Sequence, residues 1–106
     1  MTAAELFEHL ASEHLTLPGV ARRRMFGRTG LNVNGTFFAF LNHDRLVLKL
    51  PEAAAADLLA SGAARTATDL SPTMRKWVSI PTPPAIDDWR QLLQEAHAHA
   101  AAQAHP

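Results

Sequence analysis

Two short turns near the middle of the chain constrain its fold more than any other feature. Residues 31–33 alternate between apolar and polar side chains, and Asn34 with Gly35 supplies the two positive-φ residues that a tight type I′ hairpin turn requires. A second turn at residues 42–44 leads into residues 45–50 (RLVLKL), which alternate again. Because both turns are short, the sequence predicts three consecutive antiparallel strands.

Further strand signals lie on both sides of the second turn. Residues 36–41 (TFFAFL) are β-branched and aromatic, which favours a central strand covered on both faces. Residues 75–80 (RKWVSI) predict another strand, ended by prolines that cannot donate to a ladder. A short edge strand within residues 63–68 is a further candidate. The sheet should therefore have four to five strands.

Three helices are expected around this sheet. Thr2 and Glu5 form a capping box before an apolar stripe over residues 3–14. Residues 51–61 have high helix propensity, and an amphipathic helix begins near residue 86, with a tail that should fray after about residue 99. The chain is thus predicted to be a single α+β domain over residues 1–106, with an antiparallel sheet flanked by N-terminal, middle and C-terminal helices.

Composition removes several classes of function. The chain has no cysteine, which excludes disulfides, thiolate metal sites and cysteine nucleophiles, and fits a cytoplasmic location. No basic residue precedes an apolar run at the N-terminus, so no signal peptide is expected. No apolar stretch approaches the roughly 20 residues of a membrane span, and no membrane association is expected.

Candidate catalytic and metal-binding groups have unfavourable spacing. Of the six histidines, His97 and His99 are two apart on a predicted helix, and His9 and His14 are five apart, whereas helical ligand pairs are three or four apart. No serine lies in a G-x-S-x-G elbow, and no carboxylate pair has an acid–base context. We expect no metal, no cofactor and no enzymatic activity.

The basic residues are unevenly distributed. Residues 22–50 hold six basic side chains against Asp44 alone, although the ten basic and ten acidic residues of the chain balance. Six candidates for binding a partner or an anion are Arg22, Arg24, Arg28, Lys49, Arg75 and Lys76. They could form one patch if their strands adjoin, although strand alternation prevents Arg22 and Arg24 from sharing a face with Arg23.

Three interpretations of these basic residues remain open. They could be a solvated surface, a site for an acidic protein partner, or a nucleic-acid interface with Trp77 stacking on a base. The neutral overall charge weakens the last of these. Trp77 and Trp89 both fall on apolar periodicities, which favours the core for each of them.

Residues 25–30 (MFGRTG) are expected to form an irregular crossing between a strand and the following hairpin. The spacing of Gly27 and Gly30 does not make a phosphate-binding loop, and the glycines favour turn geometry over a ligand-facing loop. If either glycine has a positive φ, a β-branched substitution should cost about 1–3 kcal/mol.

Several short motifs occur in a recognisable order. They are Met25-Phe26-Gly27, Gly30-Leu31, Asn34-Gly35, Phe38-Ala39, Arg45-Leu46-Val47-Leu48-Lys49 and Trp77-Val78-Ser79-Ile80-Pro81. Over about residues 3–100, the chain resembles the N-terminal domain of the TfoX/Sxy competence-regulator family. The positions that match the family are Met25, Phe26, Gly27, Gly30, Lys49 and Trp77.

The resemblance implies an α+β fold shared with YjbR-like proteins. Full-length members regulate genes for DNA uptake, and many short members consist of this domain alone, with no assigned activity. Arg28 and Thr29 stand where the family usually has a second glycine and an aromatic residue, the chain has no tyrosine, and the second domain of the regulators has no counterpart here.

The sequence therefore predicts a non-catalytic binding or regulatory module of the TfoX N-terminal type, which contacts a protein partner through its sheet or basic edge. The alternative is a weak nucleic-acid-binding protein that uses the basic strands, and a small-molecule enzyme is the third reading. A homodimer is compatible with the sequence.

Overall fold

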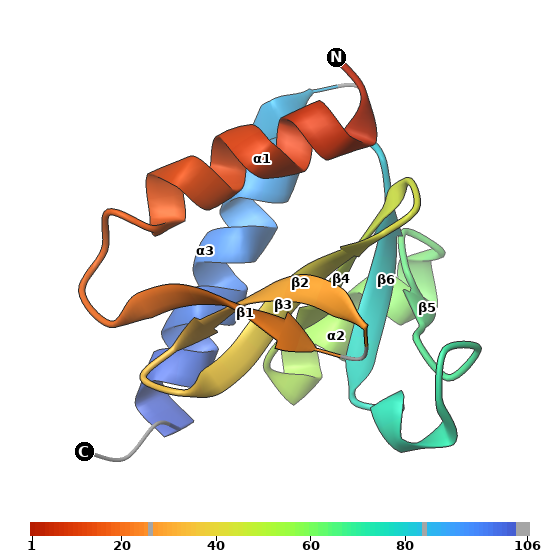
Figure 1. The fold of residues 1–106 in the computed structure, drawn as a ribbon. Helices are drawn as coiled ribbons and strands as arrows, with labels where there is room; N and C mark the ends of the chain where they lie inside the picture. Colours follow the sequence, from red (N-terminus) through yellow and green to blue (C-terminus); the bar gives the residue numbers. More distant parts are fainter. Residues whose placement is uncertain (26, 84, 104–106) are drawn as a thin grey trace.

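One antiparallel sheet organises the chain, with its strands in the order β1-β2-β3-β4-β6-β5 (Figure 1). This computed structural model describes residues 1–25, 27–83 and 85–103. The strands are β1 (Val20–Met25), β2 (Arg28–Val33), β3 (Thr36–Asn42), β4 (Arg45–Lys49), β5 (Arg65–Thr66) and β6 (Trp77–Pro81). The helices are α1 (Ala3–His14), α2 (Glu52–Ser61) and α3 (Ile86–Gln103), with a 3₁₀ turn, η1 (Pro72–Met74).

The α+β class is confirmed, and the expected strand count is slightly too low. The described residues form six strands instead of four to five. The strand left out of the count is β1, where three consecutive arginines interrupt any apolar alternation. The short edge strand expected within residues 63–68 is present as β5. None of the described helices is long and apolar enough to cross a membrane.

Two predicted boundaries are wrong. Arg75 and Lys76 precede β6 instead of beginning it, because Pro72 starts the turn η1 and Arg75 has helical dihedral angles (φ −64°, ψ −18°). Helix α3 continues to Gln103, beyond the expected fraying point. Its last turns remain helical because Ala100 is buried in the core, where a small side chain lets the helix approach the sheet.

The larger core lies between one face of the sheet and the helices α1 and α3. Leu10, Phe38, Leu48, Trp89 and other buried residues pack there. Because Trp89 is fully buried, its indole needs a partner, and Nε1 donates to the carbonyl oxygen of Pro81 at 3.0 Å. The assignment of Trp89 to the core is confirmed.

A smaller core covers the opposite face of the sheet. Trp77 packs there with Phe40, and their ring centroids are 5.7 Å apart. Met74 of η1 and Ala67, which follows β5, belong to the same buried cluster. Trp77 is 9% exposed, so its assignment to the core is also confirmed.

Strand β3 has apolar residues on both faces because residues 37–41 are all apolar, and it also contains a β-bulge. Leu31 pairs with Ala39 and Asn32 pairs with Phe37, which leaves Phe38 as an extra residue in β3. Phe38 and the next residue, Ala39, therefore both join the larger core, while Phe37 packs against the smaller one. The expectation of a central strand covered on both faces is confirmed.

The sequence predicted the turn between β2 and β3 correctly, but not the turn between β1 and β2. Asn34 and Gly35 have φ angles of 50° and 89°, as the type I′ turn requires. The irregular crossing expected over residues 25–30 is wrong. Met25 pairs directly with Arg28, so β1 and β2 form a tight hairpin, with Gly27 at φ 76° and Gly30 inside β2.

Candidate functional site

The six basic candidates occupy two separate surfaces instead of one patch. Strand β3 lies between β2 and β4, so the basic strands do not adjoin. Arg28 is the first residue of β2 and lies near the C-terminal end of the antiparallel strand β3. Lys49 is the last residue of β4, pairs with Trp77, and lies near the N-terminal end of β3. Residues Arg24 and Arg28 are consequently remote from Lys49.

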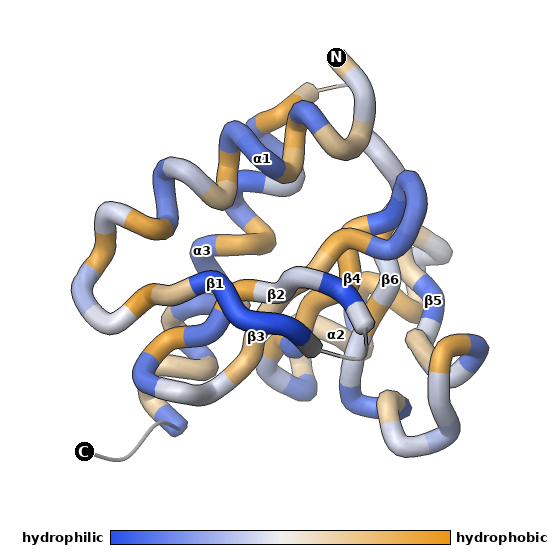
Figure 2. The backbone as a smooth tube through the Cα atoms, viewed as in Figure 1, coloured by the Kyte–Doolittle hydropathy of each residue, from blue (hydrophilic) through white to orange (hydrophobic). Residues whose placement is uncertain are grey.

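The first surface is the β1 edge, which is the edge strand Val20–Met25 of the sheet (Figure 2). Arg22 lies on its helical face, where its guanidinium donates to the Glu8 carboxylate of α1, with the shortest N–O distance at 3.1 Å. Arg23 and Arg24 are exposed, and neither forms an ion pair in the described part of the chain. The register places Arg23 opposite Gly30 and Arg24 opposite Thr29, so their side chains leave opposite faces.

The second surface is a hollow of about 490 Å³ that we call the basic cleft. It lies among α2, the end of α3 and the junctions that flank β4 and β6. Its lining comprises Lys49, Leu50, Glu52, Ala55, Ala56, Leu59, Arg75, Lys76, Val78, His99 and Gln103. The structure thus brings Lys49, Arg75 and Lys76 together, because β4 pairs with β6.

Sequence reasoning missed His99 and Gln103 as part of this cleft. Both belong to the last turns of α3, which the sequence analysis expected to fray. The stripe formed by Ala96 and Ala100 was the available signal that this segment packs on the sheet.

A second hollow, of about 480 Å³, has the opposite charge. Leu58, Ile80 and Leu92 form its apolar part, while the carboxylates of Asp88 and Glu95 are its charged side chains. These two acidic residues both belong to α3.

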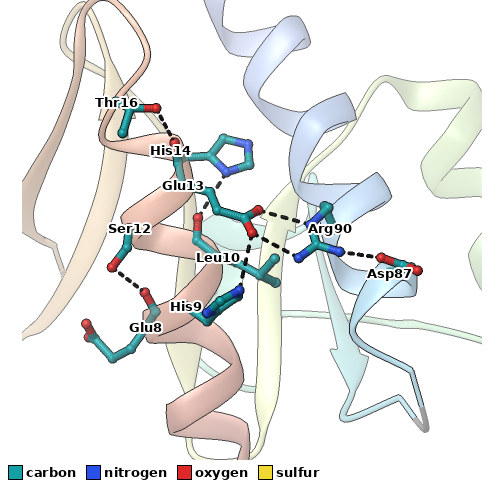
Figure 3. Close-up of polar contacts among 9 residues, drawn as sticks. All are labelled: Glu8, His9, Leu10, Ser12, Glu13, His14, Thr16, Asp87 and Arg90. Atoms are coloured by element: carbon teal, nitrogen blue, oxygen red, sulfur yellow. Dashed lines mark hydrogen bonds and ion pairs between the residues drawn. The ribbon is translucent and has the colours of Figure 1, made fainter.

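A polar contact joins α1 to α3 on the helical side (Figure 3). Arg90 donates from Nε to Oε1 of Glu13 at 3.0 Å and from Nη2 to Oε2 at 2.9 Å. The same guanidinium contacts Asp87. The hydrogen bonds from Arg90 lower the pKa of the Glu13 carboxyl.

Two histidines from distant parts of the sequence meet in the core. The His14 ring lies 5.8 Å from that of His97, centroid to centroid, and His14 Nδ1 is 3.2 Å from the carbonyl oxygen of Leu10. The Nε2 atoms of both rings are buried and have no hydrogen-bond partner among the residues that the structure describes. Burial, and then the nearby His14, lowers the pKa of His97.

The spacing of histidines along single helices could not predict this pairing, because His14 and His97 belong to different helices. His14 does follow Leu10 and Ala11 by one turn on the apolar stripe of α1, a signal for burial. Among the described residues, no group of three or more histidines, cysteines or carboxylates could hold a metal ion.

Comparison with protein families gives a match to the TfoX N-terminal domain over residues 13–103. The chain belongs to this family. The match begins in the last turn of α1, ten residues later than expected, and continues to the end of α3. No curated protein and no solved structure matches the chain.

Several of the positions expected to match the family have structural roles here. Gly27 occupies the left-handed region in the β1–β2 turn, Gly30 is buried within β2, and Trp77 belongs to the smaller core. Phe26 and the side chain of Met25 lie outside the described residues. Lys49, also expected to match the family, lines the basic cleft.

Proposed function

We propose that this TfoX N-terminal domain is a non-catalytic, cytoplasmic binding module that contacts an acidic segment of a protein partner through the β1 edge. The observation that carries the proposal is that Arg23 and Arg24 are exposed on an end strand and, among the described residues, lack an acidic partner. Arg22 of the same strand is already paired with Glu8 of α1.

The position of these charges selects the kind of partner. An end strand presents backbone N–H and C=O groups that can pair with another strand. A second copy of β1 would bring arginines against arginines, which is unfavourable across a strand pair, whereas an acidic strand would be stabilised. The same arginines that discourage self-association through this edge thus favour an acidic segment of another protein.

The engagement of the serine hydroxyls supports a non-catalytic role. Ser12 and Ser61 donate to backbone carbonyl oxygens, and Ser79 accepts a hydrogen bond from Arg45 Nε at 2.7 Å. Ser71 caps the turn η1. Each hydroxyl is occupied by a structural contact instead of a general base.

Two features favour a protein partner over a nucleic acid. Trp77, the aromatic residue expected to stack on a base, is packed against Phe40 and is 9% exposed. The basic residues are divided between the β1 edge and the basic cleft, so neither surface forms a long phosphate-binding track.

Selection from a displayed library of random peptides on the immobilised domain tests this proposal. We expect extended acidic peptides, which should shift the backbone amide resonances of residues 20–25 and bind more weakly at high salt. The double variant Arg23→Glu and Arg24→Glu should lose binding. The matched control, Arg75→Glu with Lys76→Glu, changes the charge equally at the basic cleft and should retain it. Selected peptides that are not acidic, or that bind the edge variant equally, would refute the proposal.

A further inference from the structure

We propose that the basic cleft is a second binding site, independent of the β1 edge, for a small organic phosphate: a phosphate monoester with an apolar body. The cleft combines a hollow of about 490 Å³ with an apolar wall and an uncompensated cationic rim. This volume lies within the roughly 300–1,000 Å³ typical of small-molecule sites.

The apolar wall comes mainly from α2. None of the ten residues of this helix is buried, although most of them are alanine or leucine. The short side chains of Ala55 and Ala56 leave room above Leu50 and Val78, and Leu59 is 37% exposed beside them. An apolar ligand body in the cleft would remove this surface from water, at about 25 cal/mol per Å² of apolar area buried.

The rim supplies the charge that a phosphate monoester needs. Lys49, Arg75 and Lys76 line the cleft, and none of them forms an ion pair with a described residue. Glu52 is the carboxylate that lines the cleft, so three cations and one anion give a formal balance of +2. This balance matches a doubly charged phosphate better than a singly charged carboxylate.

Two further features favour an anion at this place. Helix α2 begins after Pro51, which makes no side-chain cap, so the positive end of its dipole adds to the rim. From α3, His99 and Gln103 contribute side chains that can donate hydrogen bonds. The cations, the helix terminus and the apolar wall therefore face one hollow from three different parts of the chain.

Titration with 1-naphthyl phosphate tests the site, with calorimetry and amide resonances as readouts. We expect saturable binding that shifts the amides of residues 49–52, 75–78 and 99–103. The affinity should exceed that for inorganic phosphate, and that for 1-naphthoate, by about tenfold or more, equivalent to about 1.4 kcal/mol. Equal affinity for inorganic phosphate would show that only the cations bind, and tighter binding of 1-naphthoate would overturn the choice of phosphate.

Variants distinguish the contribution of the cationic rim to binding from that of the apolar wall. Lys49→Ala with Lys76→Ala should weaken 1-naphthyl phosphate by about tenfold or more. Ala56→Trp, at an exposed position, fills the hollow and should reduce binding of the naphthyl compound while leaving inorganic phosphate unaffected. Circular dichroism confirms that each variant is folded.

Arg23→Ala with Arg24→Ala removes the same charge at the β1 edge and is the matched control. It should bind 1-naphthyl phosphate as the parent does, even if it no longer binds acidic peptides, so the two proposals can fail separately. Unchanged affinity in both cleft variants, or amide shifts confined to residues 20–25, would overturn the inference.

Discussion

Gly27 is the residue whose backbone most restricts substitution in the β1–β2 hairpin. Its φ is +76°, and an added Cβ would have no heavy atom within 4 Å, so the cost of a side chain is conformational and not steric. We expect Gly27→Ala to lower the free energy of unfolding by about 1–2 kcal/mol, the penalty for an L-residue in this region. Urea unfolding followed by circular dichroism measures the change.

Gly27→Asn is the control for this prediction, because asparagine tolerates the left-handed region better than alanine does. It should be closer to the parent in stability. A Gly27→Ala protein as stable as the parent would show that the turn readily adopts another conformation.

Gly30 lies within β2 at a buried position, so a substitution there would act through packing and not through a positive φ.

His97 predicts a dependence of stability on pH. Burial and the neighbouring His14 lower its pKa in the folded protein, below the ordinary value of about 6.5 that the unfolded chain retains. Below about pH 6.5 the unfolded state therefore binds more protons, and the free energy of unfolding should fall as the pH falls from about 8 to about 5.5. Urea unfolding midpoints across this range measure the effect.

This pH range for His97 lies above the range in which Glu5 and Glu13 titrate, because hydrogen bonds lower both of their pKa values below 4.5. The nearby ion pair of Glu13 with Arg90 therefore keeps its charge. His97→Leu should flatten the pH dependence, whereas the control His99→Leu should leave it. An equally steep dependence in His97→Leu would assign the effect to another group.

At the scale of elements, the alternation of β3 gives neighbouring phenylalanines different environments. Phe38 is fully buried between the sheet and the helices, while Phe37 is half-buried on the other face. We expect Phe38→Ala to lower the free energy of unfolding by about 3–5 kcal/mol, as for a large buried side chain replaced by alanine. Phe37→Ala is the matched control and should cost less. Equal losses in urea unfolding would contradict the unequal burial of the two phenylalanines.

The local signals predicted most elements correctly. The capping box of Thr2 and Glu5 marks the start of α1, and Asn34 with Gly35 marks the turn between β2 and β3, because both signals depend on side chains within a few residues. Strand β1 and the bulge at Phe38 depend on partners elsewhere in the sheet. Their assignment therefore needed tertiary information.

The candidate site was predictable only in part for the same reason. The alternation of β1 correctly separated Arg23 from Arg22 and Arg24. The sequence could not reveal that β3 keeps β2 away from β4, nor that α3 brings His99 to Lys49 and Lys76. Long-range strand order and helix packing decide which charged residues become neighbours, and neither leaves a local pattern.

At the scale of the whole molecule, positive and negative charges occupy different elements. Acidic residues concentrate on α1 and α3, while exposed arginines lie on β1 and further cations line the basic cleft. With ten basic and ten acidic residues in total, the molecule is neutral but polarised. Such a distribution orients an approaching charged partner without giving strong attraction to every polyanion.

This polarity predicts weak binding to duplex DNA. Each phosphate contact contributes about −0.9 to the slope of log K against log salt, and the β1 edge offers few uncompensated arginines. We expect a dissociation constant above about 10 μM at physiological salt, within the non-specific range. Fluorescence anisotropy of labelled duplex and single strands between about 50 and 200 mM salt measures it, because six or more contacts would lose about a thousandfold over that range. Submicromolar affinity at the upper salt concentration, lost when Arg22, Arg24 and Arg28 are replaced by alanine, would instead make the β1–β2 hairpin a nucleic-acid interface.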